Sequence, residues 1–232
     1  MNEYKYKICC SGGKDSVATV ILWYIYHKDL IPETEVVFFE PMFNDTESGL
    51  LEAQYNHIYN KVIPWCNSHG FVTTVLRCNH TYVDFFTHVL RRSKHEERNG
   101  KMVGGLLSGM CTMTHYKQRT LKSYNKDAID VVGIAYDEPK RYARLTDKQY
   151  SILYEHEITE NTAKEICKSW GLLSPHYDTQ GRDGCWFCPY KLLTGFDTDH
   201  HKELLKSLYE QHKDRLVNNS VCYKLTFDDL FK

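Results

Sequence analysis

The sequence predicts an α/β protein built on a parallel β-sheet flanked by helices. The order of its apolar segments predicts this fold class, and its composition is that of a folded globular chain. Short apolar segments alternate with longer amphipathic ones, a pattern typical of parallel strands joined by crossover helices. The chain has 232 residues, of which 42% are hydrophobic and 25% charged, so it can bury a sizeable core. Its 29 Lys and Arg nearly balance 30 Asp and Glu, which excludes a disordered chain and a globally basic protein.

The first half of the chain carries the strand–helix alternation. Strands are expected at residues 6–10, 35–39, 71–76 and 128–135. Helices are expected between them, at residues 16–27, 48–69 and 81–98. The first of these helices is apolar on nearly all sides, as expected for a helix packed on a sheet.

The pattern changes after residue 135. A helix is expected at 159–170, opened by Thr159 and closed by Gly171, and a charged amphipathic helix at 199–216. The Gly-rich and Lys-containing stretch at 99–109 is expected to form a loop. These features predict an α/β domain at residues 1–145 and a C-terminal helical subdomain at residues 146–232.

Composition also indicates where the protein works. The longest apolar run, residues 17–26, is too short to span a membrane, and the first residues lack the apolar core of a signal peptide. We therefore expect a cytoplasmic protein without a membrane partner. Nine cysteines in such a chain argue against a disulfide framework.

One motif carries most of the chemistry. The first predicted strand runs directly into the hexapeptide SGGKDS, residues 11–16, and a helix follows at once. The adjacent glycines Gly12 and Gly13 let backbone N–H groups turn toward an anion, and the helix N-terminus adds partial positive charge. The motif predicts a phosphate-binding loop. It is not a Walker A loop, because Lys14 is followed by Asp15 rather than by a hydroxyl residue.

This hexapeptide resembles the signature of the PP-loop ATP pyrophosphatases. Four further segments resemble the phosphoadenosine phosphosulfate (PAPS) reductase-like branch of that family, at residues 38–47, 110–117, 133–144 and 184–189. The resemblance implies a Rossmann-like fold whose residues 1–145 bind ATP and cleave it between the α- and β-phosphates. The chain lacks the C-terminal Glu-Cys-Gly-x-His segment of the true PAPS reductases, which counts against sulfonucleotide reduction.

Site residues follow from the loop and from the expected ends of the strands. The candidate nucleotide-binding residues are Ser11, Gly12, Gly13, Lys14, Asp15, Ser16, Phe39, Gly133, Asp137 and Glu138. Lys14 would neutralise phosphate oxygens, and Phe39 would lie near the adenine. Asp15 binds Mg²⁺, orients Lys14 or forms the N-cap of the following helix, and the sequence leaves these three roles open.

Charged residues after the fourth strand form a second candidate group. Together with Lys14, the arginines Arg141 and Arg144 are the candidate catalytic residues, because guanidinium groups stabilise phosphate charge. Asp137 and Glu138 could carry Mg²⁺. The alternative for this segment is a solvated turn. A basic helix face formed by Lys117, Arg119 and Lys122 is either solvent-exposed or a nucleic-acid contact.

The thiols suggest a metal site. Cys185 and Cys188 form a C-x-x-C, which suits a zinc half-site, an iron–sulfur half-site or a redox dithiol. The pair follows a polar loop rather than a strand, which favours a metal. The family resemblance places Cys111 over the site as the third ligand. It implies a 4Fe-4S cluster, with structural zinc as the alternative, and the fourth ligand is open.

These observations predict a PP-loop enzyme that uses ATP and Mg²⁺ to adenylate a substrate for sulfur transfer. One alternative is a sulfonucleotide reductase. Another, from a different class, is a nucleotide-binding subunit of a DNA-modification or defence complex without turnover. The acceptor, a small molecule or a nucleic acid, stays open, as do the sulfur donor and the oligomeric state, a homodimer included.

Overall fold

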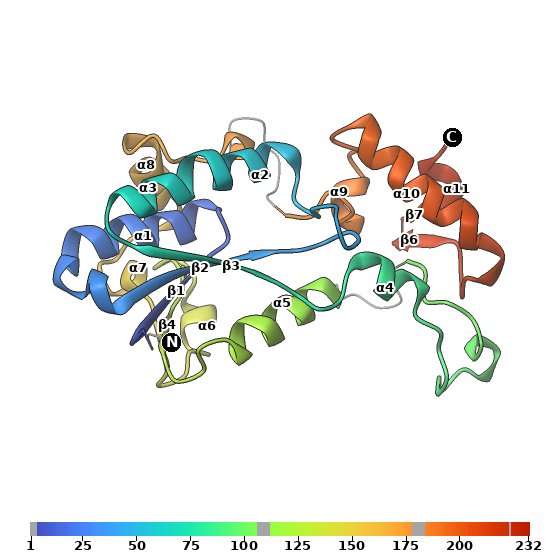
Figure 1. Cartoon of the computed structure of the whole chain (residues 1–232), viewed down its shortest axis with the longest axis horizontal. Helices are drawn as coiled ribbons and strands as arrows, with labels where there is room; N and C mark the ends of the chain where they lie inside the picture. Colours follow the sequence, from blue (N-terminus) through green and yellow to red (C-terminus); the bar gives the residue numbers. More distant parts are fainter. Residues whose placement is uncertain (1–3, 106–111, 178–183, 223) are drawn as a thin grey trace. The chain divides into compact units, whose positions relative to one another are not determined.

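The computed structural model describes residues 4–105, 112–177, 184–222 and 224–232 (Figure 1). Its main element is a five-stranded sheet with the strand order β3-β2-β1-β4-β5. β1 pairs in parallel with β2 and with β4, and β4 pairs in parallel with β5. The strands are β1 (Tyr6–Cys10), β2 (Thr34–Glu40), β3 (Val72–Arg77), β4 (Ile129–Val131) and β5 (Gln149–Tyr150). The predicted α/β fold class is confirmed.

The centre of the sheet is fully buried. Ile8 in β1, Val36 and Val37 in β2 and Val131 in β4 are 0% exposed, so apolar side chains cover both faces. Four strands lie where the sequence predicts them, although β4 ends at Val131 instead of continuing to residue 135. β5 was not predicted, because two residues are too short to give a periodic signal.

Helices around the sheet follow the apolar pattern in most places. α1 (Lys14–Tyr26) is buried continuously from Ser16 to Trp23 and packs against α7 (Ile152–Glu155) and α8 (Glu160–Ser169). The predicted helix at 48–69 forms α2 (Glu52–His57), a π-helical turn (Ile58–Val62) and α3 (Ile63–Ser68). Pro64 lies just after the π-helical turn; it has no N–H for the regular ladder, and the wider turn before it accommodates this break.

The predicted helix at 81–98 is wrong beyond its first turns. α4 (Tyr82–Thr87) starts with a capping box between Thr81 and Asp84 and ends after six residues. The chain then extends, and Val89 pairs antiparallel with Met102. This pairing satisfies backbone groups through residues that are distant in sequence, which a helical periodicity does not register.

The remaining elements are mostly short. They are the 3-10 turns Lys28–Glu33, Glu96–Arg98, Pro175–Tyr177 and Lys213–Arg215, the helices α5 (Thr112–Ser123), α6 (Pro139–Tyr142), α9 (Pro189–Leu192), α10 (Asp199–His212) and α11 (Phe227–Leu230), and the hairpin strands β6 (Ser220–Cys222) and β7 (Leu225–Thr226). The helix predicted at 199–216 thus ends at His212 and continues as a 3-10 turn.

The chain divides into two compact units, each made of three segments. The sheet unit comprises Met1–Phe39, Glu52–Leu76 and Thr120–Asp183, and the second unit comprises Glu40–Leu51, Arg77–Arg119 and Gly184–Lys232. This division differs from the single boundary predicted after residue 145. The described residues 146–177 belong with the sheet because β5 pairs with β4 and α8 packs on α1.

The second unit has an apolar core of its own. Phe43, Tyr82, Phe86, Trp186 and Phe187 are all buried there. Tyr82 stacks on Phe187 at 4.4 Å between ring centroids, and Phe43 lies 4.7 Å from Trp186. Across the described part of the chain, no helix combines the length and the apolar character needed to cross a membrane.

Candidate functional site

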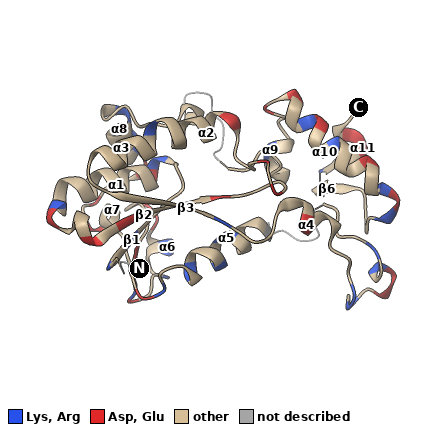
Figure 2. Ribbon diagram, viewed as in Figure 1, with Lys and Arg blue, Asp and Glu red and all other residues tan. Residues whose placement is uncertain are grey.

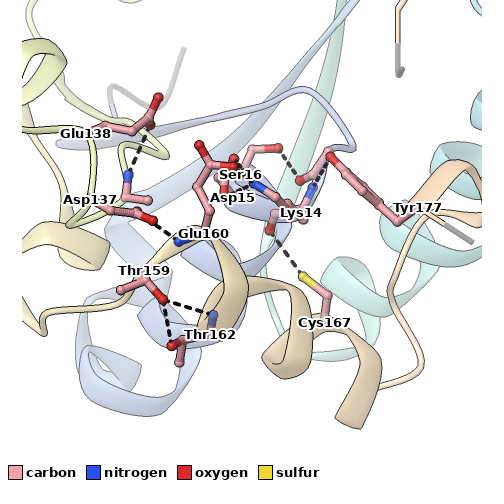
Figure 3. Close-up of polar contacts among 12 residues, drawn as sticks. Lys14, Asp15, Ser16, Asp137, Glu138, Thr159, Glu160, Thr162, Cys167 and Tyr177 are labelled. Carbon is pink, nitrogen blue, oxygen red and sulfur yellow. Dashed lines mark hydrogen bonds and ion pairs between the residues drawn. The ribbon is translucent and has the colours of Figure 1, made fainter. Parts of the chain in front are cut away.

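The candidate site lies at the carboxyl end of the central strand. β2 and β3 lie on one side of β1, and β4 and β5 lie on the other. The carboxyl ends of β1 and β4 therefore flank a topological switch point, where open α/β sheets bind their ligands. The SGGKDS loop follows β1, and residues 132–138 follow β4, so the sheet brings together the two segments singled out in the sequence (Figure 3).

The loop has a backbone that only glycine accepts. Gly12 has a φ of +79°, and a Cβ there would lie 2.6 Å from Cγ1 of Ile58. Gly13 is the N-cap of α1 and has extended backbone angles. The amides of the first helical turn therefore stand at the loop without intrahelical acceptors, and the positive end of the helix dipole lies behind them. This arrangement suits an anion.

The two serines hold the loop in shape. The Ser16 hydroxyl donates to the carbonyl of Gly13 at 2.9 Å and accepts from the amide of Ser11 at 3.1 Å. The two hydroxyl oxygens lie 3.2 Å apart. The side chain of Gln54 in α2 donates to the Ser11 carbonyl at 3.0 Å. Both hydroxyls thus already take part in hydrogen bonds that define the curvature of the loop.

Lys14 is held between two carboxylates. Its Nζ lies 2.9 Å from both carboxylate oxygens of Asp15 and 2.8 Å from Oε2 of Glu160 (Figure 3). Burial acts to lower the pKa of Lys14, but the hydrogen bonds and charges of Glu160 and Asp15 outweigh it, and the pKa is raised. Lys14 therefore stays cationic at neutral pH.

Asp15 lies among other acidic groups. Burial raises its pKa; Lys14 opposes this effect, and the charges of Glu160 and Glu138 add to it. The N-cap role considered for Asp15 is wrong, because Gly13 is the N-cap and Asp15 lies in the first turn of α1. Its carboxylate pairs with Lys14 and is the group that could bind a metal cation.

The residues present fit a magnesium ion that arrives with a phosphate ligand. Within the described residues, no group of three His, Cys, Asp or Glu side chains is arranged to hold a metal. Mg²⁺ commonly uses one or two carboxylates and takes its other ligands from water and substrate phosphates. Asp15 and Glu160, which meet at Lys14, are the carboxylates that suit this role.

The acidic residues after β4 are engaged in local hydrogen bonds. Oδ1 of Asp137 accepts from the amide of Glu160 at 3.0 Å, so Asp137 caps α8. The Glu138 carboxylate accepts from the amide of Ala135 at 3.3 Å, and from Nη1 of Arg141 at 2.6 Å for each oxygen. Arg144 donates from Nε to the carbonyl of Lys140 at 2.9 Å. The roles predicted for Arg141 and Arg144 at a phosphate stay predictions.

Gly133 and Phe39 lie next to the loop. A Cβ on Gly133 would lie 2.8 Å from both the carbonyl carbon of Asp15 and the amide nitrogen of Ser16, so Gly133 lets the segment after β4 approach the start of α1 closely. Phe38 of β2 is the register partner of Cys10 in β1. The next residue, Phe39, therefore lies beside the start of the loop. Phe39 is 8% exposed. Its contact with an adenine ring stays a prediction.

Three residues at the loop were not predicted. Besides Glu160, the Tyr177 hydroxyl accepts from the amide of Lys14 at 3.1 Å, and the Cys167 thiol donates to the carbonyl of Lys14 at 3.1 Å. Burial raises the pKa of Cys167 to about 12, so this thiol is not an activated nucleophile. Only Glu160 had a local signal, as the first residue after the N-cap Thr159.

The C-x-x-C lies in the second unit and forms a tight turn. The amide of Cys188 donates to the carbonyl of Cys185 at 3.0 Å, Gly184 before it has a φ of +142°, and Pro189 begins α9. Both cysteines are half-buried. Cys111, the predicted third ligand, lies outside the described residues, and so do residues 106–109 of the predicted loop at 99–109. The three-thiolate site stays a prediction.

Comparisons with known proteins give distant structural similarities. No protein-family model matches the chain, and no curated protein matches it. Among solved structures, the U34-tRNA thiolase NcsA from Methanococcus maripaludis, described with its 4Fe-4S cluster, is similar with a TM-score of 0.47 and 14% identity, over 96% of this chain and 75% of that one. The NH3-dependent NAD synthetase from Campylobacter jejuni, in complex with nitrate, is similar with a TM-score of 0.41 and 13% identity, over 93% of this chain and 85% of that one. The fold class rests on the strand order and pairing described above.

Proposed function

We propose that this chain is a PP-loop enzyme that binds ATP or another adenylyl nucleotide at residues 11–16 and acts at the α-phosphate. The observation that carries the proposal is the position of the loop. A glycine turn leads from the central strand into the N-terminus of a 13-residue helix, at the switch point of the sheet, and a cationic lysine stands beside it.

The loop residues have separate tasks in this proposal. The amides of Asp15 and Ser16 in the first turn of α1 bind phosphate oxygens, while the Lys14 amide donates to the Tyr177 hydroxyl. Gly12 keeps the backbone free of a side chain there. Lys14 exchanges a carboxylate partner for a phosphate, since both are anions. A magnesium ion bound with the nucleotide would neutralise further phosphate charge, with Asp15 and Glu160 as its protein ligands.

The reaction proposed is adenylation followed by displacement. An oxygen of the substrate attacks the α-phosphorus, the bond to the bridging oxygen of the β-phosphate breaks, and pyrophosphate leaves. A sulfur nucleophile, or a nitrogen one, then displaces AMP from the substrate. Lys14, Arg141 and Arg144 are the proposed stabilisers of charge at the α-phosphate. Arg141 would have to exchange its pairing with Glu138 for the phosphate.

Sulfur transfer is the finer part of the proposal and rests on the C-x-x-C turn. The described residues supply two thiol side chains there, Cys185 and Cys188, which suffice for half of a metal site. We propose a 4Fe-4S cluster, with zinc as the alternative. Metal and sulfide analysis of anaerobically purified protein tests this. Cys185→Ser and Cys188→Ser should each lose the metal, and the matched control Cys78→Ser should keep it. Protein without metal contradicts a metal site.

Nucleotide binding is tested by calorimetry with a non-hydrolysable ATP analogue. Charge-assisted hydrogen bonds contribute about 1.5–3 kcal/mol, so Lys14→Ala should weaken binding by about tenfold to somewhat over a hundredfold. The control Lys168→Ala removes an exposed cation near the C-terminal end of α8. This variant should bind the nucleotide as the wild type does. Unchanged affinity in Lys14→Ala would place the nucleotide elsewhere.

Turnover is tested by pyrophosphate release across candidate acceptors. Release that depends on an acceptor supports adenylation. Sulfite formed from a sulfonucleotide in the presence of a thiol would favour the reductase alternative. Tight nucleotide binding without release for any acceptor would favour a binding subunit.

A further inference from the structure

A basic segment of the second unit has no role in the nucleotide site. Residues 88–101, which we call the basic tongue, leave the end of α4 and return beside it. The amide of Leu90 donates to the carbonyl of Lys101 at 2.9 Å, and the amide of Gly100 donates to the carbonyl of Leu90 at 2.8 Å. Ser93 donates its amide to Oδ1 of Asn99 at 2.8 Å. Hydrogen bonds across the tongue therefore define its shape.

The tongue concentrates positive charge in a chain whose formal net charge is −1. Figure 2 shows Lys and Arg along the loop that follows α4. The tongue has five cationic residues against the two acidic residues Glu96 and Glu97. The cationic residues are Arg91, Arg92, Lys94, Arg98 and Lys101. A local excess of this size attracts anions.

The three arginines of the tongue line one cavity. The cavity has a volume of about 560 Å³, and its lining residues are 88–93 and Arg98. Arg91 and Arg92 are exposed and Arg98 is half-buried. Among the ion pairs between described residues, none involves these three arginines, while Glu97 pairs with His95 at 3.6 Å. Their guanidinium groups are therefore available to an external anion.

The chemistry selects a phosphate polymer as the ligand. Guanidinium groups bind phosphate in a two-pronged geometry, and a cavity lined by three of them suits phosphate oxygens. Lys94 and Lys101 extend the charge beyond the residues that line the cavity, so one phosphate group would leave cations unused. The tongue contributes no large exposed apolar side chain of the kind that inserts into a lipid surface.

We propose that the basic tongue binds the phosphodiester backbone of a nucleic acid, with Arg91, Arg92 and Arg98 on successive phosphates. Contacts of this kind position a strand without reading its sequence. The proposal concerns a different unit from the nucleotide loop and does not rest on ATP binding there.

The test is fluorescence anisotropy of the full chain with labelled single-stranded RNA and DNA of one sequence, over about 50–200 mM salt. The logarithm of the binding constant falls linearly with the logarithm of the salt concentration, and each phosphate contact to a single strand makes this slope steeper by about 0.7. The triple variant Arg91→Gln/Arg92→Gln/Arg98→Gln should reduce that slope by about 2 and weaken binding about tenfold or more at low salt. RNA and DNA should respond alike, because backbone contacts are shared.

A matched control removes three cations elsewhere. Lys126→Gln/Lys202→Gln/Lys206→Gln changes the net charge equally and should keep a slope within about 1 of the wild type. Lys14→Ala should bind nucleic acid as the wild type does, which separates this proposal from the nucleotide site. The double variant Lys94→Gln/Lys101→Gln should lose less affinity for nucleic acid than the triple variant. It tests the proposal even if the triple variant does not fold.

Five results would overturn the proposal. One is no binding by the wild type, and another is equal losses in the triple variant and the control. Displacement of RNA by polyglutamate at equal charge would assign the tongue to an acidic protein partner. Displacement by low concentrations of inorganic phosphate, or equal binding to vesicles rich in phosphatidylserine, would assign it to a single phosphate or to a membrane surface.

Discussion

The ammonium group of Lys14 lies 2.8 Å from a carboxylate oxygen of Glu160, although 146 positions separate the two residues in the chain. Glu160 is the first residue of α8, and Asp137 caps the same helix end. The charge of the lysine that we propose for phosphate binding is thus balanced in part by a carboxylate of α8, a helix that the sequence assigns to another domain. An incoming phosphate must compete with this carboxylate, and the first prediction follows from that competition.

Glu160→Gln should tighten the binding of pyrophosphate in the absence of Mg²⁺ by about two- to fivefold. The substitution removes one of the two negative charges at Lys14, and half-exposed ion pairs contribute about 0–1 kcal/mol. Calorimetry measures the affinity. Glu165→Gln, on an exposed position of the same helix, should bind as the wild type does. If Glu160 holds Mg²⁺, the same variant should bind the magnesium complex more weakly.

Gly133→Ala should damage the loop. Its Cβ would lie 2.8 Å from backbone atoms of Asp15 and Ser16, which cannot turn aside as a side-chain end can. Overpacking of this kind costs about 1–3 kcal/mol, measured as a fall in the free energy of unfolding. Nucleotide affinity should fall as well, because the displaced backbone forms the binding loop.

Gly171→Ala is the control for Gly133→Ala. Gly171 has a φ of +68° and nothing within 4 Å of an added Cβ, so the substitution strains the backbone without touching the site. It should lower stability by about 1 kcal/mol and leave nucleotide affinity unchanged. Equal losses of affinity in both variants would show that Gly133 has no special role at the loop.

His57 should make the protein less stable as the pH falls from about 6.5 to about 4. Burial, with the charges of Lys61 and His176, lowers the pKa of His57 to about 4 from the ordinary value of 6.5. Between these values the unfolded chain binds a proton that the folded chain does not, so the free energy of unfolding decreases as the pH falls. Urea unfolding at several pH values measures the slope.

The histidine that causes this pH dependence can be identified by substitution. His57→Gln should remove part of the loss between pH 6.5 and pH 4. His95→Gln changes an exposed histidine in the second unit and should keep the wild-type slope. The assignment fails if both variants show the same pH dependence.

Lys7→Met should destabilise the sheet unit strongly. The Lys7 side chain is 1% exposed; its Nζ donates to the carbonyls of Leu121 at 2.8 Å and Tyr124 at 2.6 Å and lies 3.0 Å from Oδ1 of Asp130. Removing one partner of a buried ion pair costs about 3–5 kcal/mol. Thermal and urea unfolding should show the loss.

The matched control for Lys7→Met is Lys5→Met, two residues earlier. The ion pair of Lys5 with Glu33 is exposed, with 71% of the Lys5 side chain accessible. Solvent screens an exposed pair of this kind, so this variant should unfold nearly as the wild type does. A small effect of Lys7→Met would mean that the apolar replacement packs as well as the ion pair.

Local sequence was sufficient for the strands at the centre of the sheet and for the loop. β1 has the predicted bounds because a mostly apolar run ends just before the loop that contains the glycine pair. The helix begins at Lys14, directly after the glycines and two residues before its predicted start. Each of these signals acts over a few neighbouring residues. The phosphate-binding character of residues 11–16 therefore depends on chemistry that the sequence already contains.

Tertiary structure alone decided which distant segments complete the site and where the units divide. Glu160 and Cys167 reach Lys14 because α8 packs on α1, and Tyr177 reaches it from a 3-10 turn that packs on α2. A local pattern does not contain such packing. The basic tongue forms where a helix was predicted because Val89 pairs with Met102, thirteen residues later in the sequence. In each case the free energy comes from contacts between residues far apart in the chain, and those contacts exist only once the chain has folded.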